Sequence, residues 1–124
     1  MLLNLSNHPS NSWSDIQIAE ANKHFGQVVD IPFPHVDPNG DEHYICSLAD
    51  LYFDICTEKL SNFPDENCAV HVMGELNFTF LLVSKLRNAG IKCIASTTER
   101  NAIEKNGLKI SEFKFVRFRE YTLC

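Results

Sequence analysis

The fold of this chain is indicated first by one stretch in its middle, Val70-His71-Val72-Met73-Gly74-Glu75-Leu76-Asn77-Phe78-Thr79. An apolar run that begins at Cys68 stops at Gly74-Glu75, and a helical pattern starts directly after it. A buried strand that turns through glycine into a helix directs free backbone N–H groups and the positive end of the helix dipole at one point. Ligands bind at such junctions in open α/β sheets. We therefore predict a ligand site near residues 74–77.

The rest of the chain alternates between strand and helix patterns. Strands are predicted at residues 1–6, 28–34, 68–73 and 91–96, and helices at residues 14–25, 45–60 and 76–89. Asn106-Gly107 is a strong hairpin signal, and a long strand is predicted behind it at residues 108–121. This order predicts one α/β domain over residues 1–124, with a three-layer Rossmann-like sheet that is mostly parallel. The expected strand order is 2-1-3-4, and a C-terminal β-hairpin extends one edge.

Composition narrows the class of protein. The chain has 124 residues, of which 44% are hydrophobic and 22% charged, and its formal charge of −5 argues against a broad face for duplex nucleic acid. We find no signal peptide and no run near the roughly 20 apolar residues that span a bilayer. Four of the five cysteines fall in apolar helix or strand patterns, and none forms a Cys-x-x-Cys pair. We therefore expect reduced core thiols in a cytoplasmic protein without a zinc site.

Three loops are predicted to open at one edge of the sheet, because each follows the carboxyl end of a parallel strand. They are residues 6–12, 74–77 and 96–100. The loops share hydroxyl, amide and imidazole groups with few carboxylates, and their candidate site residues are Ser6, Asn7, His8, Ser10, Gly74, Glu75, Asn77, Ser96, Thr97, Thr98 and Arg100. This set favours a phosphate or sugar ligand and is poor for binding Mg²⁺.

Most of these residues also have a purely structural interpretation. Asn7 and Ser10 are typical of turns, Gly74 permits a sharp bend, and Glu75 stabilises a helix N-terminus whatever the function. His71 lies inside an apolar strand and is interpreted as a core residue rather than a catalyst.

The last strand carries a second candidate surface. Alternation predicts that Arg117 and Arg119 share one face with Phe113, Phe115 and Tyr121. The two arginines would bind phosphates there, contact a partner subunit, or simply be solvated. No Gly-x-Gly-x-x-Gly, Walker A, Gly-x-Ser-x-Gly or His-Glu-x-x-His sequence is present, which argues against dinucleotide, P-loop, serine-hydrolase and zinc-protease functions.

Four segments together resemble a family of small stand-alone proteins associated with type III CRISPR systems. They are residues 3–9, Gly74-Glu75 with Thr79, residues 95–100 and residues 115–121. The resemblance spans nearly the whole chain. These proteins are relatives of the CARF (CRISPR-associated Rossmann fold) sensor domains, and several are ring nucleases. The resemblance implies a CARF-like fold and a homodimer that binds cyclic oligoadenylate, most often cyclic tetra-adenylate, over the carboxyl strand edges.

The same resemblance implies a metal-independent phosphodiesterase that needs no cofactor. A ribose 2′-OH attacks the adjacent phosphorus and leaves a 2′,3′-cyclic phosphate, and this cleavage switches off antiviral signalling. In this scheme His8 is the candidate acid, and Asn7 or Ser6 orients the 2′-OH. Charge on the phosphoryl oxygens would be stabilised by N–H groups after Gly74, by Ser96 and Thr97, and by Arg100.

Two other functions fit the sequence. One is a binding protein that sequesters cyclic oligoadenylate without cutting it. The other is a small doubly wound domain that acts in protein assembly, with Arg117, Arg119 and the neighbouring aromatic residues as its partner surface.

Overall fold

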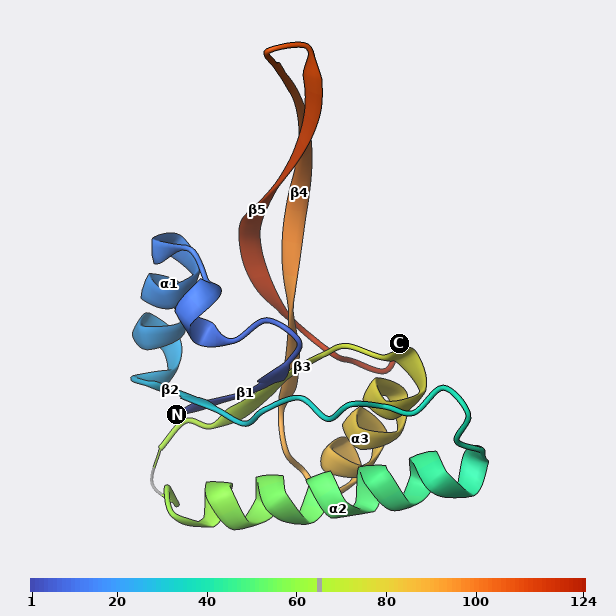
Figure 1. Ribbon diagram of the computed structural model, residues 1–124. Coiled ribbons are helices and arrows are strands. Elements are labelled where there is room, and N and C mark those ends of the chain that lie inside the picture. The colour runs from blue at the N-terminus through green and yellow to red at the C-terminus, as the bar shows by residue number, and fades with distance from the viewer. Residues whose placement is uncertain (65) are drawn as a thin grey trace.

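The centre of the sheet is made by the two most apolar segments of the chain. In the computed structural model, which describes residues 1–64 and 66–124, β1 (Leu2–Ser6) and β3 (Ala69–Met73) pair in parallel. All of β1 is buried, and β3 is buried up to Val72. Helices cover both faces of these strands (Figure 1). A strand covered on both faces is apolar along its length rather than alternating, which explains why both segments read as continuous apolar runs.

The strand order β2-β1-β3-β4-β5 confirms the predicted mostly parallel sheet with a C-terminal hairpin. The outer strands are β2 (Val28–Asp30), β4 (Cys93–Lys105) and β5 (Leu108–Glu120). Among the strands of the described residues, β4 and β5 pair antiparallel and the others pair in parallel. Asn106 and Gly107 both have positive φ, 55° and 75°, as a two-residue hairpin turn requires. β2 lies at an edge as predicted but ends at Asp30, because Pro32 and Pro34 have no N–H to donate to a ladder.

The helices separate into two layers. α1 (Asp15–Phe25) covers one face of the sheet, and α2 (Glu42–Ser61) and α3 (Leu76–Asn88) cover the other (Figure 1). Each layer has its own apolar cluster, one around Leu2, Trp13 and Ile94, and the other around Val70, Phe78 and Leu82. A short 3₁₀ helix (Ser10–Ser12) precedes α1. The sequence also predicts a turn at residues 61–67, and residue 65 within it lies outside the described residues.

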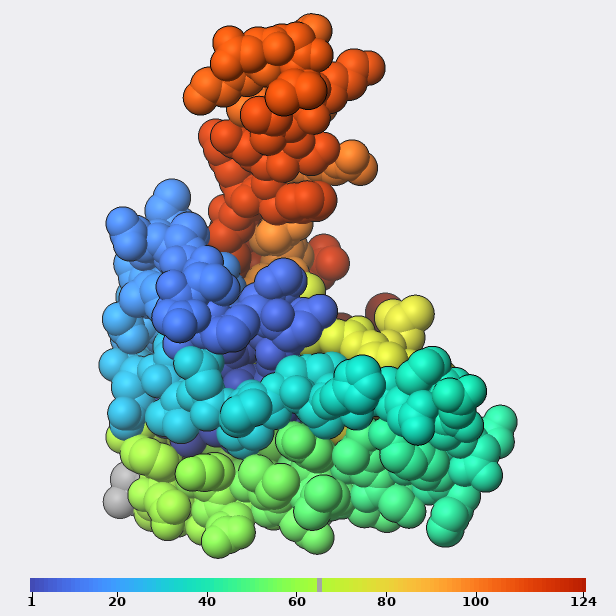
Figure 2. Space-filling model, in the orientation of Figure 1, coloured from blue at the N-terminus to red at the C-terminus, as the bar shows by residue number. Residues whose placement is uncertain are grey.

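The prediction that residues 96–100 form a loop is wrong. β4 continues through them to Lys105, and they pair with β5, for example Thr98 with Phe115 and Arg100 with Phe113. The backbone stays extended because β5 supplies a hydrogen-bonding partner along its whole length. The two strands leave the body of the protein as a long, twisted ribbon (Figures 1 and 2).

The predicted alternation along β5 is also wrong, because a β-bulge interrupts it. Thr97 pairs with Arg117 but Thr98 pairs with Phe115, so Val116 is an extra residue. A bulge changes which face the following side chains occupy. Phe113, Phe115 and Phe118 therefore face the α1 side of the sheet, whereas Arg117, Arg119 and Tyr121 face the opposite side. Two contacts show the change: the Phe115 and Phe118 rings are 4.9 Å apart, and the Tyr121 hydroxyl donates to the Val72 carbonyl at 2.7 Å.

All five cysteines are free thiols, but not all lie in the core. Cys56 and Cys93 are buried, and burial raises the pKa of each to about 12. Cys46 was expected in the core and is instead exposed. Among the described residues, the helices are all too short or too polar to cross a membrane.

Candidate functional site

Three polar side chains on neighbouring strands form a hydrogen-bonded row near the carboxyl edge of the sheet. Asn4 on β1 and His71 on β3 are each 1% exposed, and Ser96 on β4 is half-buried. His71 Nδ1 lies 2.9 Å from Asn4 Oδ1, and His71 Nε2 lies 2.7 Å from Ser96 Oγ. Asn4 and His71 are register partners across the β1–β3 pair, which holds their side chains at one level.

The partners of Asn4 fix the tautomer of His71. The Asn4 amide nitrogen donates to Asp30 Oδ1 at 2.8 Å and to the His8 carbonyl at 3.0 Å, which leaves Oδ1 to face the imidazole. Since Oδ1 only accepts, His71 Nδ1 carries the proton and Nε2 is the acceptor. Ser96 Oγ–H then donates to Nε2, while Gln17 Nε2 donates to Ser96 Oγ at 3.0 Å.

His71 is held in its neutral form. Burial, and secondarily the charge of nearby His8, lower the pKa of His71 to about 4. Its ring packs edge-on against Trp13 at 5.2 Å and against Phe118 at 5.8 Å. Trp13 also donates its indole N–H to the His8 carbonyl at 2.9 Å. The imidazole is therefore fixed in position and uncharged at neutral pH.

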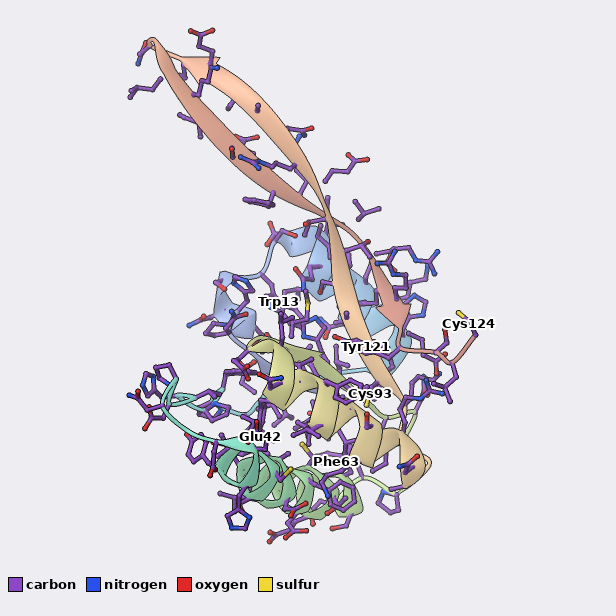
Figure 3. The ribbon with its side chains drawn as sticks, turned by 90° about the vertical axis from the view of Figure 1, so that its right-hand side faces the viewer. Trp13, Glu42, Phe63, Cys93, Tyr121 and Cys124 are labelled. Carbon is purple, nitrogen blue, oxygen red and sulfur yellow. The ribbon has the colours of Figure 1, made fainter. Side chains whose placement is uncertain are left out.

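An open groove of about 860 Å³ lies over this row, between the start of α1 and the base of the β4–β5 ribbon. Its lining combines apolar and aromatic side chains with a few polar groups: His8, Ser12, Trp13, Ser14, Ile16, Gln17, His71, Met73, Ser96, Thr98, Phe113, Lys114 and Phe115. Figure 3 shows Trp13 beside the ribbon. A mostly apolar groove with a few convergent polar groups is typical of a small-molecule site.

The first predicted loop contributes unevenly to this groove. His8 is exposed and lines it. Ser6 is only 5% exposed and its hydroxyl donates to Asn4 Oδ1 at 2.8 Å, so its side chain lies beneath the groove instead of lining it. Ser10 Oγ donates to Asp30 Oδ2 at 2.6 Å and thereby braces the loop. Asn7 is exposed but does not line the groove.

At the junction of residues 74–77, where a ligand site is predicted, packing and helix capping account for Gly74 and Glu75. A Cβ atom on Gly74 would lie 2.2 Å from the Phe33 ring, so glycine is required for packing. The Glu75 carboxylate accepts hydrogen bonds from the backbone N–H groups of Asn77 and Phe78, both at 2.9 Å. These N–H groups were predicted to bind phosphate, and the side chain of Glu75 occupies them instead. Gly74, Glu75 and Asn77 do not line the groove.

The residues predicted on the last two strands are divided between two faces. Ser96 and Thr98 line the groove, whereas Thr97 faces away and its hydroxyl bonds the backbone of Arg117. Arg100 lies farther along the ribbon, where its Nη2 donates to Ser111 Oγ at 3.1 Å. Arg117 and Arg119 are on the face opposite the groove because of the bulge. Lys114 borders the groove, but it pairs with Glu99 and alternates with Phe113 and Phe115, so its side chain starts from the same face as Arg117.

Sequence reasoning missed three residues of the site: Gln17, His71 and Trp13. Gln17 was interpreted through its capping-box spacing with Ser14, and its backbone N–H does bond Ser14 Oγ at 3.2 Å. Its side chain, however, reaches Ser96. A signal for His71 was present, since two polar residues, Asn4 and His71, interrupt otherwise apolar central strands. Among the described residues, no three His, Cys, Asp or Glu side chains cluster as a metal site.

Fold and groove together define an α/β protein of Rossmann-like topology with a candidate ligand site at the carboxyl edge of its parallel strands. The chain belongs to the family described as the Uncharacterized protein MJ1673 family, whose pattern matches residues 1–119. No curated protein and no solved structure matches the sequence.

Proposed function

We propose that the protein is a ring nuclease that binds cyclic oligoadenylate, with cyclic tetra-adenylate as the first candidate, and linearises it. The observation that carries this proposal is the groove at the carboxyl edge, where aromatic walls adjoin hydroxyl, imidazole and amide groups. The four sequence segments that resemble CRISPR-associated ring nucleases support it. On this proposal the protein acts in the cytoplasm and switches off type III CRISPR signalling.

The groove has side chains for both parts of a nucleotide. Phe113 is 67% exposed, and it stands beside half-buried Phe115 on the ribbon wall. Adenine rings would stack on these side chains, and such stacking contributes about 1–3 kcal/mol per base. The Thr98 hydroxyl, on the same face of the ribbon as Phe115, would contact phosphate oxygens.

The reaction proposed is attack by a ribose 2′-OH on the adjacent phosphorus. The bond from phosphorus to the 5′-oxygen breaks, and a 2′,3′-cyclic phosphate remains. His8, exposed at the rim, would give its proton to the leaving 5′-oxygen. The protein's main task is to hold the three reacting atoms in line and to stabilise charge on the phosphoryl oxygens.

A homodimer would enlarge the site and cover the ribbon. A two-stranded ribbon alone is marginally stable in water. Ribbon residues Leu108 and Phe113 are each 67% exposed, and Val116 is 49% exposed. β4 and β5 carry six Lys or Arg and four Glu, a net charge of +2, whereas the whole chain carries −5. The ribbon of a second protomer could therefore cover these apolar side chains, and the positive ribbon of one protomer would be attracted to the negative remainder of the other.

The test is incubation of purified protein with labelled cyclic tetra- and hexa-adenylate in EDTA. We expect linear products ending in a 2′,3′-cyclic phosphate, and loss of cleavage with retained binding in His8→Ala. Thr98→Ala should weaken binding, whereas Thr97→Ala, a matched loss of a hydroxyl on the opposite face, should not. Tight binding without products would make the protein a binding protein that sequesters the ring, and neither binding nor cleavage would overturn the proposal.

A further inference from the structure

We infer that Ser96 is an activated nucleophile, with His71 as its general base and Gln17 as the donor to the developing oxyanion, and that the groove hydrolyses carboxylic esters. This is a different activity from ring cleavage and does not depend on it. The inference rests on the hydrogen-bonded row from Asn4 to Ser96 and on the opening of its Ser96 end into the groove.

The geometry has the three parts that nucleophilic catalysis requires. A hydroxyl must lie within hydrogen-bonding distance of a base, and a third group must orient that base. Ser96 Oγ lies 2.7 Å from His71 Nε2, and Asn4 Oδ1 lies 2.9 Å from Nδ1 on the other side of the ring. Asn4 is itself held by Asp30 at 2.8 Å, so the imidazole cannot turn without breaking a chain of bonds.

The direction of each hydrogen bond matches this role. The Nδ1 tautomer leaves Nε2 as an acceptor, which is the state that takes a proton from the serine. The low pKa of His71 keeps the ring neutral at physiological pH, although it also makes His71 a weak base. Slow turnover, and slow covalent labelling that still depends on His71, are therefore the expected signature.

Gln17 supplies an oxyanion donor, which the row of Asn4, His71 and Ser96 lacks. Its Nε2 donates to Ser96 Oγ at 3.0 Å, and the residue is 9% exposed, so the amide is already fixed beside the reacting atom. Once Oγ bonds to the carbonyl carbon, the amide N–H can turn from Oγ to the adjacent carbonyl oxygen, where a fixed donor stabilises the negative charge of the tetrahedral intermediate. A buried glutamine side chain on the first turn of α1 is not needed to cap that helix, because Ser14 does so.

The reaction is balanced without a further reagent. Ser96 Oγ bonds to the carbonyl carbon as its proton passes to His71 Nε2. The tetrahedral intermediate collapses with cleavage of the carbon–oxygen ester bond, and His71 returns the proton to the departing alcohol. Water then adds to the acyl-serine by the same route, and the carboxylic acid and free Ser96 are regenerated. Trp13, Ile16 and Phe115 around the site favour an ester with an apolar or aromatic acyl group.

The test is covalent labelling of the intact protein by a fluorophosphonate, read by mass spectrometry, together with hydrolysis of p-nitrophenyl butyrate. We expect one adduct per chain at Ser96, absent from Ser96→Ala and slowed at least tenfold in His71→Gln. Ser84→Ala, which alters a serine on α3 outside the groove whose hydroxyl bonds the Phe80 carbonyl, should label like wild type. Gln17→Ala should still fold and should hydrolyse the ester at least tenfold more slowly, so the inference stays testable if His71→Gln unfolds.

The pH dependence distinguishes an activated serine from a structural one. The groups that face His71 are His8 and, through Asn4, Asp30. With neutral His71 as the base, the labelling rate should be flat from pH 7.5 to 5.5. A base that titrates at the ordinary histidine value of about 6.5 would give roughly a tenfold fall over this range. Labelling elsewhere than Ser96, a rate unchanged in His71→Gln, or such a fall would overturn the inference.

Discussion

Asn4 Oδ1 on β1 accepts a hydrogen bond of 2.9 Å from His71 Nδ1 on β3, and both side chains are 1% exposed. This contact joins the two central strands through their side chains as well as their backbones. It also determines which nitrogen of His71 faces Ser96. The stability of the core and the chemistry of the groove therefore depend on one pair of residues.

Acid should destabilise the protein through His71. The pKa of His71 is about 4 in the folded state, against about 6.5 for a free histidine, so the unfolded chain binds the proton more readily. Its contribution to stability is complete above pH 6.5 and falls as pH drops toward 4. The expected loss is about 2 kcal/mol by pH 5. Urea unfolding at pH 7.5 and pH 5 measures it, and an equal loss in His71→Gln would contradict this assignment.

Asn4→Leu should destabilise the fold far more than Ser96→Ala. The first change removes the partner of buried His71 Nδ1–H and of the Ser6 hydroxyl, and should cost about 2–4 kcal/mol. The second removes bonds at the half-buried groove end, where water can replace them, and should cost about 1 kcal/mol. Chemical unfolding at pH 7.5 compares the two variants. Equal losses would show that the row is not a core element.

Gly74→Ala should destabilise through a clash with Phe33, because the new Cβ would lie 2.2 Å from that ring. The expected cost is about 1–3 kcal/mol. In a Phe33→Leu background the six-membered ring is gone, so the same substitution should cost much less. A double-mutant cycle of unfolding free energies tests this coupling. Additive effects would mean that Gly74 is required for a reason other than packing.

Glu75→Ala should weaken the start of α3 without affecting the groove. Its carboxylate caps the N–H groups of Asn77 and Phe78, and loss of such a cap costs about 1 kcal/mol. Glu75→Gln, which keeps an acceptor oxygen, should lose less. Thermal unfolding measures the cost, and binding of cyclic tetra-adenylate by the folded variant should be unchanged. If Glu75→Ala no longer binds cyclic tetra-adenylate, residues 74–77 would be part of the ligand site.

The sheet could be predicted because its signals are local. Apolar runs, a serine cap, glycine stops and Asn106-Gly107 each specify nearby backbone, and the preference for right-handed crossovers supplies the strand order. The bulge at Val116 could not be predicted this way. A single extra residue reverses the faces of Arg117 and Arg119, and nothing in the alternation of β5 marks it.

The candidate site was only partly predictable for a similar reason. The carboxyl edge of the sheet was expected, and His8, Ser96 and Thr98 do line the groove there. A polar group can bind a ligand only if other residues do not already hydrogen-bond it, and those residues are often distant in the sequence. Gln17 and Ser96 are 79 residues apart, and Asn4 and His71 are 67 apart. At residues 74–77 the deciding contact is local instead. The Glu75 carboxylate accepts hydrogen bonds from the N–H groups that led us to predict a ligand site there.

The most direct test of the account is a fluorescence titration with cyclic tetra-adenylate. Trp13 is the only tryptophan of the chain and lines the groove, so its emission reports on a ligand there. His8→Ala protein keeps the ring intact during the measurement. The account predicts a saturable change in emission at one ring per two chains, weakened by Phe115→Ala and unchanged by Arg119→Gln. No change in emission together with no binding by calorimetry would contradict the claim that this groove holds the ring.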